Sequence, residues 1–291
     1  MATGSQWLSG SRPRTLPAAF APVIVGTGLA IGVTSFNGWA ALLSLIVAVA
    51  LQVGVNYSND YSDGIRGTDE ARVGPVRLVG QGLAPANQVK RAAFASFVVA
   101  MVAGLGLMLI TQKWWLILVG LACVAAAWLY TGGKHPYGYL GLGEIFVFVF
   151  FGLVPVVGTF YVQALTVNAG SVIAACGVGF LSCAILVTNN LRDIPGDTES
   201  GKRTLAVRLG DSRTRVLYLA LVIASAVCVV ALALTYSKSA VVALASFALA
   251  VPPVRLVMSG AKGRDLIAAL KGTGTLVLVY GLVLGIALAL N

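Results

Sequence analysis

Residues 38–63 read GWAALLSLIVAVALQVGVNYSNDYSD, an apolar run that leads directly into an acidic segment. The part over 38–58 holds no charged residue. Its length matches the about 20 apolar residues that a helix needs to cross a hydrocarbon core ~30 Å thick. Asp60 and Asp63 follow at once. The stretch predicts a membrane-spanning helix that ends in carboxylates at the bilayer surface.

Further apolar runs of similar length fill most of the chain. Hydrophobic residues make up 58% of the 291 positions and charged residues only 10%, whereas about 25% of a soluble domain is charged. This composition excludes a water-soluble fold. It predicts an all-α polytopic membrane protein with nine transmembrane helices in a single domain, residues 1–291. The nine expected spans are 16–36, 38–58, 92–111, 114–130, 140–163, 170–188, 216–235, 239–258 and 273–290.

The basic residues follow the membrane topology. A net charge of +10 would suggest nucleic acid in a soluble protein. Here every Lys and Arg except Lys113 and Lys238 lies in the N-terminal segment, or in or beside the connections that follow even-numbered spans. By the positive-inside rule this side is cytoplasmic, so the N-terminus is expected inside and the C-terminus outside. We therefore expect membrane lipid as a partner and no nucleic acid.

The acidic residues lie on the same side as the basic ones. Of the ten, all but Glu144 occupy those connections, and Glu144 lies near the cytoplasmic start of the fifth span. Ion-coupled transporters usually keep ionisable groups inside the bundle. The distribution favours a reaction centre at the cytoplasmic mouth of a helical bundle, and a membrane transporter remains the alternative of another class.

Two connections resemble each other. Residues 55–82 read VNYSNDYSDGIRGTDEARVGPVRLVGQG, and residues 187–210 read VTNNLRDIPGDTESGKRTLAVRLG. Aligning Asp60 with Asp193 also aligns Asn56 with Asn189, and each loop then reaches a Val-Arg-Leu triplet. Four spans separate the loops, which predicts two similar four-helix halves with both loops on one face.

Carboxylates in these loops recur at helical spacing. Asp60 and Asp63 are three residues apart, and Asp193 and Asp197 are four apart. Such pairs share a helix face and repel each other unless a cation lies between them. Mg²⁺ typically joins one or two carboxylates to phosphate oxygens, so the pattern predicts Mg²⁺ sites that clamp a diphosphate. Three amides add neutral oxygen ligands or hydrogen-bond donors: Asn56, Asn59 and Asn189.

Basic side chains in the same connections are candidates for phosphate contact. Arg77 and Arg208 are the arginines of the two Val-Arg-Leu triplets, one in each loop. An arginine fork suits phosphate oxygens. The connection 130–144, YTGGKHPYGYLGLGE, adds a glycine-rich third element in which Lys134 follows Tyr130 by four residues. His135 fits a turn better than a catalytic base, and the role of Glu144 stays open.

These residues together resemble the signature of the UbiA superfamily of intramembrane prenyltransferases. The resemblance rests on Asn59-Asp60-xx-Asp63 with Asp69, on Asp193-xxx-Asp197, and on Tyr130-xxx-Lys134. The segments SRPRTLPAAFAPVIVGT and NDYSDGIRGTD further resemble the menaquinone-pathway branch, and the six-residue step from Asp63 to Asp69 is associated with it. The resemblance implies a UbiA-like bundle whose metal ligands are Asp60, Asp63, Asp69, Asp193 and Asp197.

The resemblance also implies a reaction. A polyprenyl group passes from polyprenyl diphosphate to 1,4-dihydroxy-2-naphthoate with loss of carbon dioxide, which gives demethylmenaquinone, with Mg²⁺ as cofactor. Lys134 and Arg77 assist departure of the diphosphate, and Tyr130 steadies the allylic cation or positions the leaving group. The expected diphosphate contacts are Asn56, Asn59, Arg77, Lys134, Asn189, Lys202 and Arg208.

Within the same fold, another acceptor such as 4-hydroxybenzoate is the main alternative. A CDP-alcohol phosphotransferase is disfavoured, because the second acidic pair lies far from Asp60-xx-Asp63-Gly64 along the chain.

Overall fold

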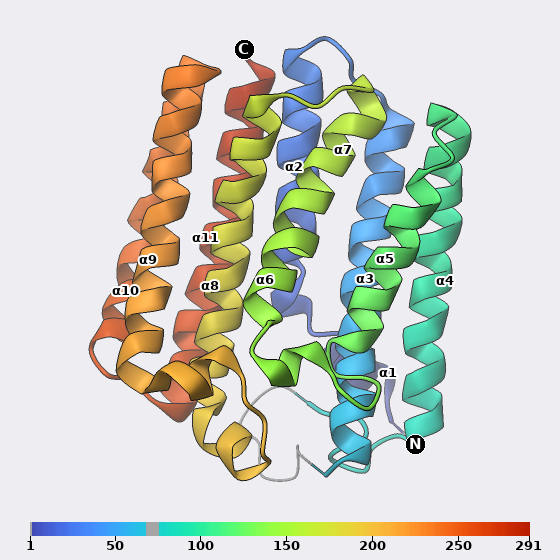
Figure 1. Ribbon diagram of the computed structural model, residues 1–291, viewed down its shortest axis with the longest axis vertical. Helices are drawn as coiled ribbons and strands as arrows, with labels where there is room; N and C mark the ends of the chain where they lie inside the picture. Colours follow the sequence, from blue (N-terminus) through green and yellow to red (C-terminus); the bar gives the residue numbers. More distant parts are fainter. Residues whose placement is uncertain (1, 68–75) are drawn as a thin grey trace.

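A computed structural model describes residues 2–67 and 76–291. Within these residues the chain forms a bundle of helices whose long axes run roughly alongside one another (Figure 1). The elements in chain order are α1 (Gly4–Gly10), η1 (Pro13–Thr15), α2 (Pro17–Gly32), α3 (Gly38–Ile65), α4 (Ala86–Thr111), α5 (Leu116–Leu129), η2 (Tyr137–Leu140), α6 (Gly143–Val147), η3 (Phe148–Leu153), α7 (Val154–Ala164), α8 (Ala169–Glu199), α9 (Leu205–Thr235), η4 (Lys238–Ala250), α10 (Val251–Met258), η5 (Gly263–Asp265) and α11 (Leu266–Ala289).

The helices confirm an all-α membrane bundle. Seven helices in the described part of the chain are long and apolar enough to span a membrane, and the bent series from Gly4 to Gly32 adds an eighth. Its two parts meet at 51°. The apolar helix α5 has 14 residues and is too short to be counted with these spans. The expected count of nine depends on α5 and stays a prediction.

Two helices extend well beyond the expected apolar spans. The span expected over 38–58 continues as α3 to Ile65, and the span over 170–188 continues as α8 to Glu199. Both acidic clusters therefore lie on helices, as their spacing predicted. Figure 1 shows these helix ends at the lower end of the bundle, together with the connection between α5 and α6; the N-terminus lies at this end and the C-terminus at the other.

Small residues let the helices approach closely where they support the site. Helices α6, η3 and α7 form one series from Gly143 to Ala164, and η3 packs against α8. A Cβ at Gly152 of η3 would lie 2.5 Å from the Cα of Gly179 in α8. Small residues are the usual means of tight packing in membranes, where lipid is as apolar as the helices. This contact holds α8, and with it the second acidic cluster, against the α6–α7 series.

Candidate active site

A cavity of about 670 Å³ lies within the bundle, and its wall includes residues from the end that carries the acidic clusters. Its polar wall is made by residues that lie far apart in sequence but meet in space, among them Asn59, Asp63, Arg77, Asp197 and Lys202. Deeper in the bundle the wall becomes apolar. That part is lined by Val47, Met101, Val124, Phe150 and Val162, among others. The cavity suits a ligand with a charged head and a long apolar tail.

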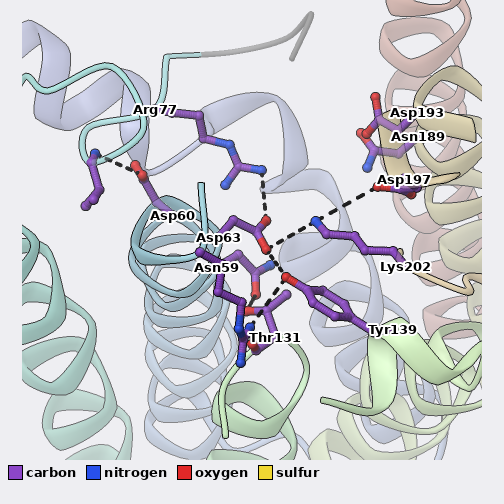
Figure 2. Close-up of polar contacts among 12 residues, drawn as sticks. Asn59, Asp60, Asp63, Arg77, Thr131, Tyr139, Asn189, Asp193, Asp197 and Lys202 are labelled. Carbon is purple, nitrogen blue, oxygen red and sulfur yellow. Dashed lines mark hydrogen bonds and ion pairs between the residues drawn. The ribbon is translucent and has the colours of Figure 1, made fainter. Parts of the chain in front are cut away.

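Asp63 is the centre of the polar wall (Figure 2). The Tyr139 hydroxyl donates to its Oδ1 at 2.5 Å, and the Lys202 ammonium lies 3.3 Å from the same oxygen. Arg77 Nη2 lies 3.6 Å from Asp63 Oδ2. Lys202 also lies 3.9 Å from Asp197 Oδ1. One buried ammonium therefore joins a carboxylate of the first acidic cluster to a carboxylate of the second.

Asp60 has a different environment from Asp63. It is fully buried and does not line the cavity. Its carboxylate accepts from the backbone amides of Leu78 at 2.7 Å and Val79 at 3.1 Å. These two hydrogen bonds fix the backbone next to Arg77, and so help to place the Arg77 guanidinium against Asp63. Asp60, a predicted metal ligand, thus accepts hydrogen bonds from backbone amides in this structure.

Asp193 is likewise turned to a local partner. Arg192 donates from Nε to Asp193 Oδ1 at 2.7 Å and from Nη2 to Oδ2 at 2.8 Å, a bidentate pair. The same Nη2 donates to Asn189 Oδ1 at 2.8 Å. Asp193 is not part of the cavity wall, whereas Asn189 and Asp197 are. Among the described residues, the two carboxylates on the cavity wall are therefore Asp63 and Asp197.

The other two predicted amides also line the cavity. Asn56 donates from Nδ2 to the Ser11 carbonyl at 2.8 Å and to Thr15 Oγ1 at 3.1 Å. Asn59 accepts from Thr131 Oγ1 at 2.8 Å. Asn56 thus ties α3 to the N-terminal segment, and Asn59 ties it to the connection after α5.

Tyr130 and Lys134 belong to the connection after α5, and Arg208 belongs to the second loop. Tyr130 lines the cavity, but Lys134 and Arg208 are exposed and do not. Helix α5 ends at Leu129, and Gly133 has a left-handed φ of 78°, so the chain turns before Lys134 and the i,i+4 relation to Tyr130 is lost. Asp69 lies outside the described residues.

Sequence reasoning missed Tyr139, Thr131 and Arg66. Arg66 donates to the carbonyls of Thr131 and Gly133, the latter at 2.5 Å, and so anchors the connection after α5 to the end of α3. Burial, and next the charge of Asp63, raise the pKa of the Tyr139 hydroxyl, which keeps it a donor. Only the glycine-rich character of 130–144 hinted that this connection approaches the site.

The donor set fits a hard divalent cation. Asp63 and Asp197 already converge on a cationic group, and Asn59 and Asn189 add amide oxygens to the same wall. Among the described residues, no three acidic, His or Cys side chains gather into a preformed metal site. Mg²⁺ is usually held by one or two carboxylates and completed by substrate phosphates, so Asp63 and Asp197 on the cavity wall suit it.

Comparison with known proteins identifies the family. The UbiA prenyltransferase family matches residues 19–271 of this chain. The chain belongs to the UbiA prenyltransferase family. It is an integral membrane enzyme of the prenyl-transfer class, and the transporter alternative is not supported.

Two relatives match over almost their full length, and a third matches over about three quarters of its length. The 1,4-dihydroxy-2-naphthoate octaprenyltransferase of Mycobacterium leprae (strain TN) is 53% identical over 290 residues, covering 100% of this chain and 98% of the relative. The protein of the same name from Mycobacterium tuberculosis is 54% identical over 289 residues, covering 99% and 98%. That from Escherichia coli (strain K12) is 43% identical and covers 76% of this chain and 74% of the relative.

Solved structures confirm the fold. A UbiA homologue from Archaeoglobus fulgidus bound to DMAPP and Mg²⁺ has a TM-score of 0.68 at 16% identity, covering 96% of this chain and 99% of that chain. The same homologue bound to GPP and Mg²⁺ gives a TM-score of 0.69 at 15% identity, with the same coverage. The helical bundle of this chain is therefore the UbiA fold.

Proposed function

We propose that this protein transfers a polyprenyl group from polyprenyl diphosphate to 1,4-dihydroxy-2-naphthoate. The acceptor loses carbon dioxide, the product is the reduced (quinol) form of demethylmenaquinone, and the reaction depends on Mg²⁺. The observation that carries the proposal is the contact of Lys202 with both Asp63 and Asp197 at the head of an apolar cavity. Full-length relatives named for this acceptor support the choice of substrate.

The charged wall would bind the diphosphate. Asp63 and Asp197 would hold Mg²⁺, with Asn59 and Asn189 as further oxygen ligands or donors. When bound, Mg²⁺ would supply the positive charge that neutralises the diphosphate as it leaves. Lys202 and Arg77 lie beside these carboxylates and would contact the phosphate oxygens directly.

The apolar wall would accommodate the prenyl chain. The bond from the allylic carbon to the diphosphate oxygen breaks, and the diphosphate leaves with the electron pair. A ring carbon of the acceptor forms the new bond, the bond between the ring and its carboxylate breaks, carbon dioxide leaves, and that electron pair returns to the ring. The apolar walls exclude water, which would otherwise capture the allylic cation. Tyr130 lines the cavity, where it would steady this cation or position the leaving group.

The remaining predicted residues are proposed in supporting roles. Asp60 and Asp193 would serve as metal ligands only if they released the amides of 78–79 and Arg192. Asp69 is proposed as a further ligand on sequence grounds alone. Lys134 and Arg208 are exposed, and Asn56 contacts the N-terminal segment, so a role of these three in diphosphate binding requires movement when substrate binds.

The topology completes the proposal. We place α5 across the membrane as the ninth span and treat the chain as two similar four-helix halves, each contributing one acidic cluster. We propose that the N-terminus and the site lie on the cytoplasmic side and the C-terminus outside, and the Lys and Arg distribution supports this orientation.

The direct test supplies purified protein with polyprenyl diphosphates, Mg²⁺, and either 1,4-dihydroxy-2-naphthoate or 4-hydroxybenzoate. Mass spectrometry of the lipid product reports the acceptor, loss of carbon dioxide and tail length together. We expect a decarboxylated naphthalene product. Product from 4-hydroxybenzoate and none from the naphthoate would refute the assigned acceptor.

A further inference from the structure

Tyr139 lies where three segments of the site meet. Its hydroxyl contacts Asp63 at the end of α3, and its backbone carbonyl accepts from the Arg203 amide at 3.0 Å in the connection between α8 and α9. Arg66, the residue that follows α3, donates to the Tyr139 hydroxyl oxygen at 3.4 Å. Tyr139 thus contacts the segments that carry both acidic clusters, although it lies in a third segment between α5 and α6.

The hydroxyl and the ring of Tyr139 contact different members of the site. The hydroxyl donates to Asp63 Oδ1 at 2.5 Å, close to where the Lys202 ammonium approaches the same oxygen. The Lys202 ammonium lies 4.6 Å from the centroid of the Tyr139 ring, which makes a cation–π contact. The hydroxyl therefore restricts the carboxylate, and the ring restricts the ammonium.

We propose that Tyr139 is a positioning residue that fixes Asp63 for metal binding through its hydroxyl and Lys202 for diphosphate binding through its ring. This inference rests on the proposed function of Asp63 and Lys202. Groups that hydrogen-bond to metal ligands orient them, and their loss typically weakens metal binding about 10- to 100-fold. The donor comes from a connection outside both acidic motifs, so neither motif alone builds the site.

Two substitutions separate the roles, and a neighbouring tyrosine supplies the control. Tyr139→Phe removes the hydroxyl and keeps the ring, whereas Tyr139→Leu removes both. Tyr137→Phe removes a hydroxyl from the same short helix. That hydroxyl donates to the Ala126 carbonyl at 2.7 Å and has no hydrogen bond to a carboxylate in the described part of the chain. Binding of Mn²⁺ to the purified, detergent-solubilised protein is measured by electron paramagnetic resonance at saturating inorganic pyrophosphate, and pyrophosphate binding is measured by calorimetry.

We expect Tyr139→Phe to weaken Mn²⁺ binding about 10- to 100-fold, with a matching rise in the Mg²⁺ concentration needed for prenyl transfer. Tyr137→Phe should bind Mn²⁺ as the wild type does. Tyr139→Leu should in addition weaken pyrophosphate binding, by about 3- to 30-fold, because Lys202 loses its aromatic contact.

Unchanged Mn²⁺ affinity in Tyr139→Phe would overturn the inference and leave the proposed function intact. So would a loss of fold in Tyr139→Phe with Tyr137→Phe intact, since the hydroxyl would then be needed for structure. A wild-type protein that binds no Mn²⁺ with pyrophosphate would instead overturn the proposed function on which the inference depends.

Discussion

Replacing Lys202 with Met tests how the two acidic clusters are held together. Lys202 is 6% exposed, and its ammonium is the cation between Asp63 and Asp197. Met is similar in length and apolar, so the substitution removes charge with little change in packing. Asp63 and Asp197 then lose the ammonium that lies 3.3 Å and 3.9 Å from them, while the Arg77 guanidinium stays 3.6 Å from Asp63.

The expected cost follows from this burial. Removing one partner of a buried ion pair costs about 3–5 kcal/mol, which corresponds to a fall of roughly 6–20 °C in melting temperature for a chain of about this size. Mg²⁺ with pyrophosphate should restore more stability to the variant than to the wild type, because it replaces the missing charge. Loss of one charge-assisted contact to the diphosphate, about 1.5–3 kcal/mol, should lower kcat/KM roughly 10- to 150-fold.

The assay compares thermal unfolding of the detergent-solubilised proteins with and without Mg²⁺ and pyrophosphate, alongside transfer kinetics. Lys262→Met is the matched control, since Lys262 is exposed and does not line the cavity. A Lys202→Met protein that melts within about 2 °C of the wild type, whatever the Mg²⁺ concentration, would refute the reasoning.

Three other outcomes follow from the structure. Asp60→Asn should lower the melting temperature, because its amide group opposes the Leu78 or Val79 amide, yet change the Mg²⁺ dependence of transfer less than Asp63→Asn; equal shifts in Mg²⁺ dependence would assign Asp60 to the metal. Chelation of divalent cations should abolish prenyl transfer, and added Mg²⁺ should restore it; full turnover in excess chelator would contradict the metal role. Gly152→Ala should destabilise the protein by about 1–3 kcal/mol or more through its collision with Gly179, measured by thermal unfolding against Gly158→Ala, whose added methyl meets nothing within 4 Å; equal melting temperatures would contradict the packing.

Much of the bundle could be predicted from apolar runs, because the bilayer imposes a minimum span length. The helical spacing of the acidic residues also correctly placed both clusters on helices, α3 and α8, at one end. Spacing fixes which residues share a helix face, but it does not fix which neighbour a carboxylate will contact.

The limits of prediction are clearest at Asp60 and Tyr139. Asp60 turns to backbone amides in a segment that returns 18 residues later, a tertiary contact with no periodic signal. Tyr139 lies in an irregular connection whose path depends on Arg66 and on the left-handed Gly133. The exposure of Lys134 has a related cause, because α5 ends at Leu129 and the chain then turns at the left-handed Gly133.

The central claim is that carboxylates from both acidic clusters hold one metal–diphosphate group at the head of the cavity. The most direct measurement is a crystal structure with Mn²⁺ and an unreactive prenyl thiodiphosphate, in which anomalous scattering locates the metal. The account predicts Mn²⁺ in contact with Asp63 and Asp197 and with the same diphosphate, whose tail lies in the apolar part of the cavity. Manganese bound to only one cluster, or a diphosphate outside the space between Asp63 and Asp197, would contradict it.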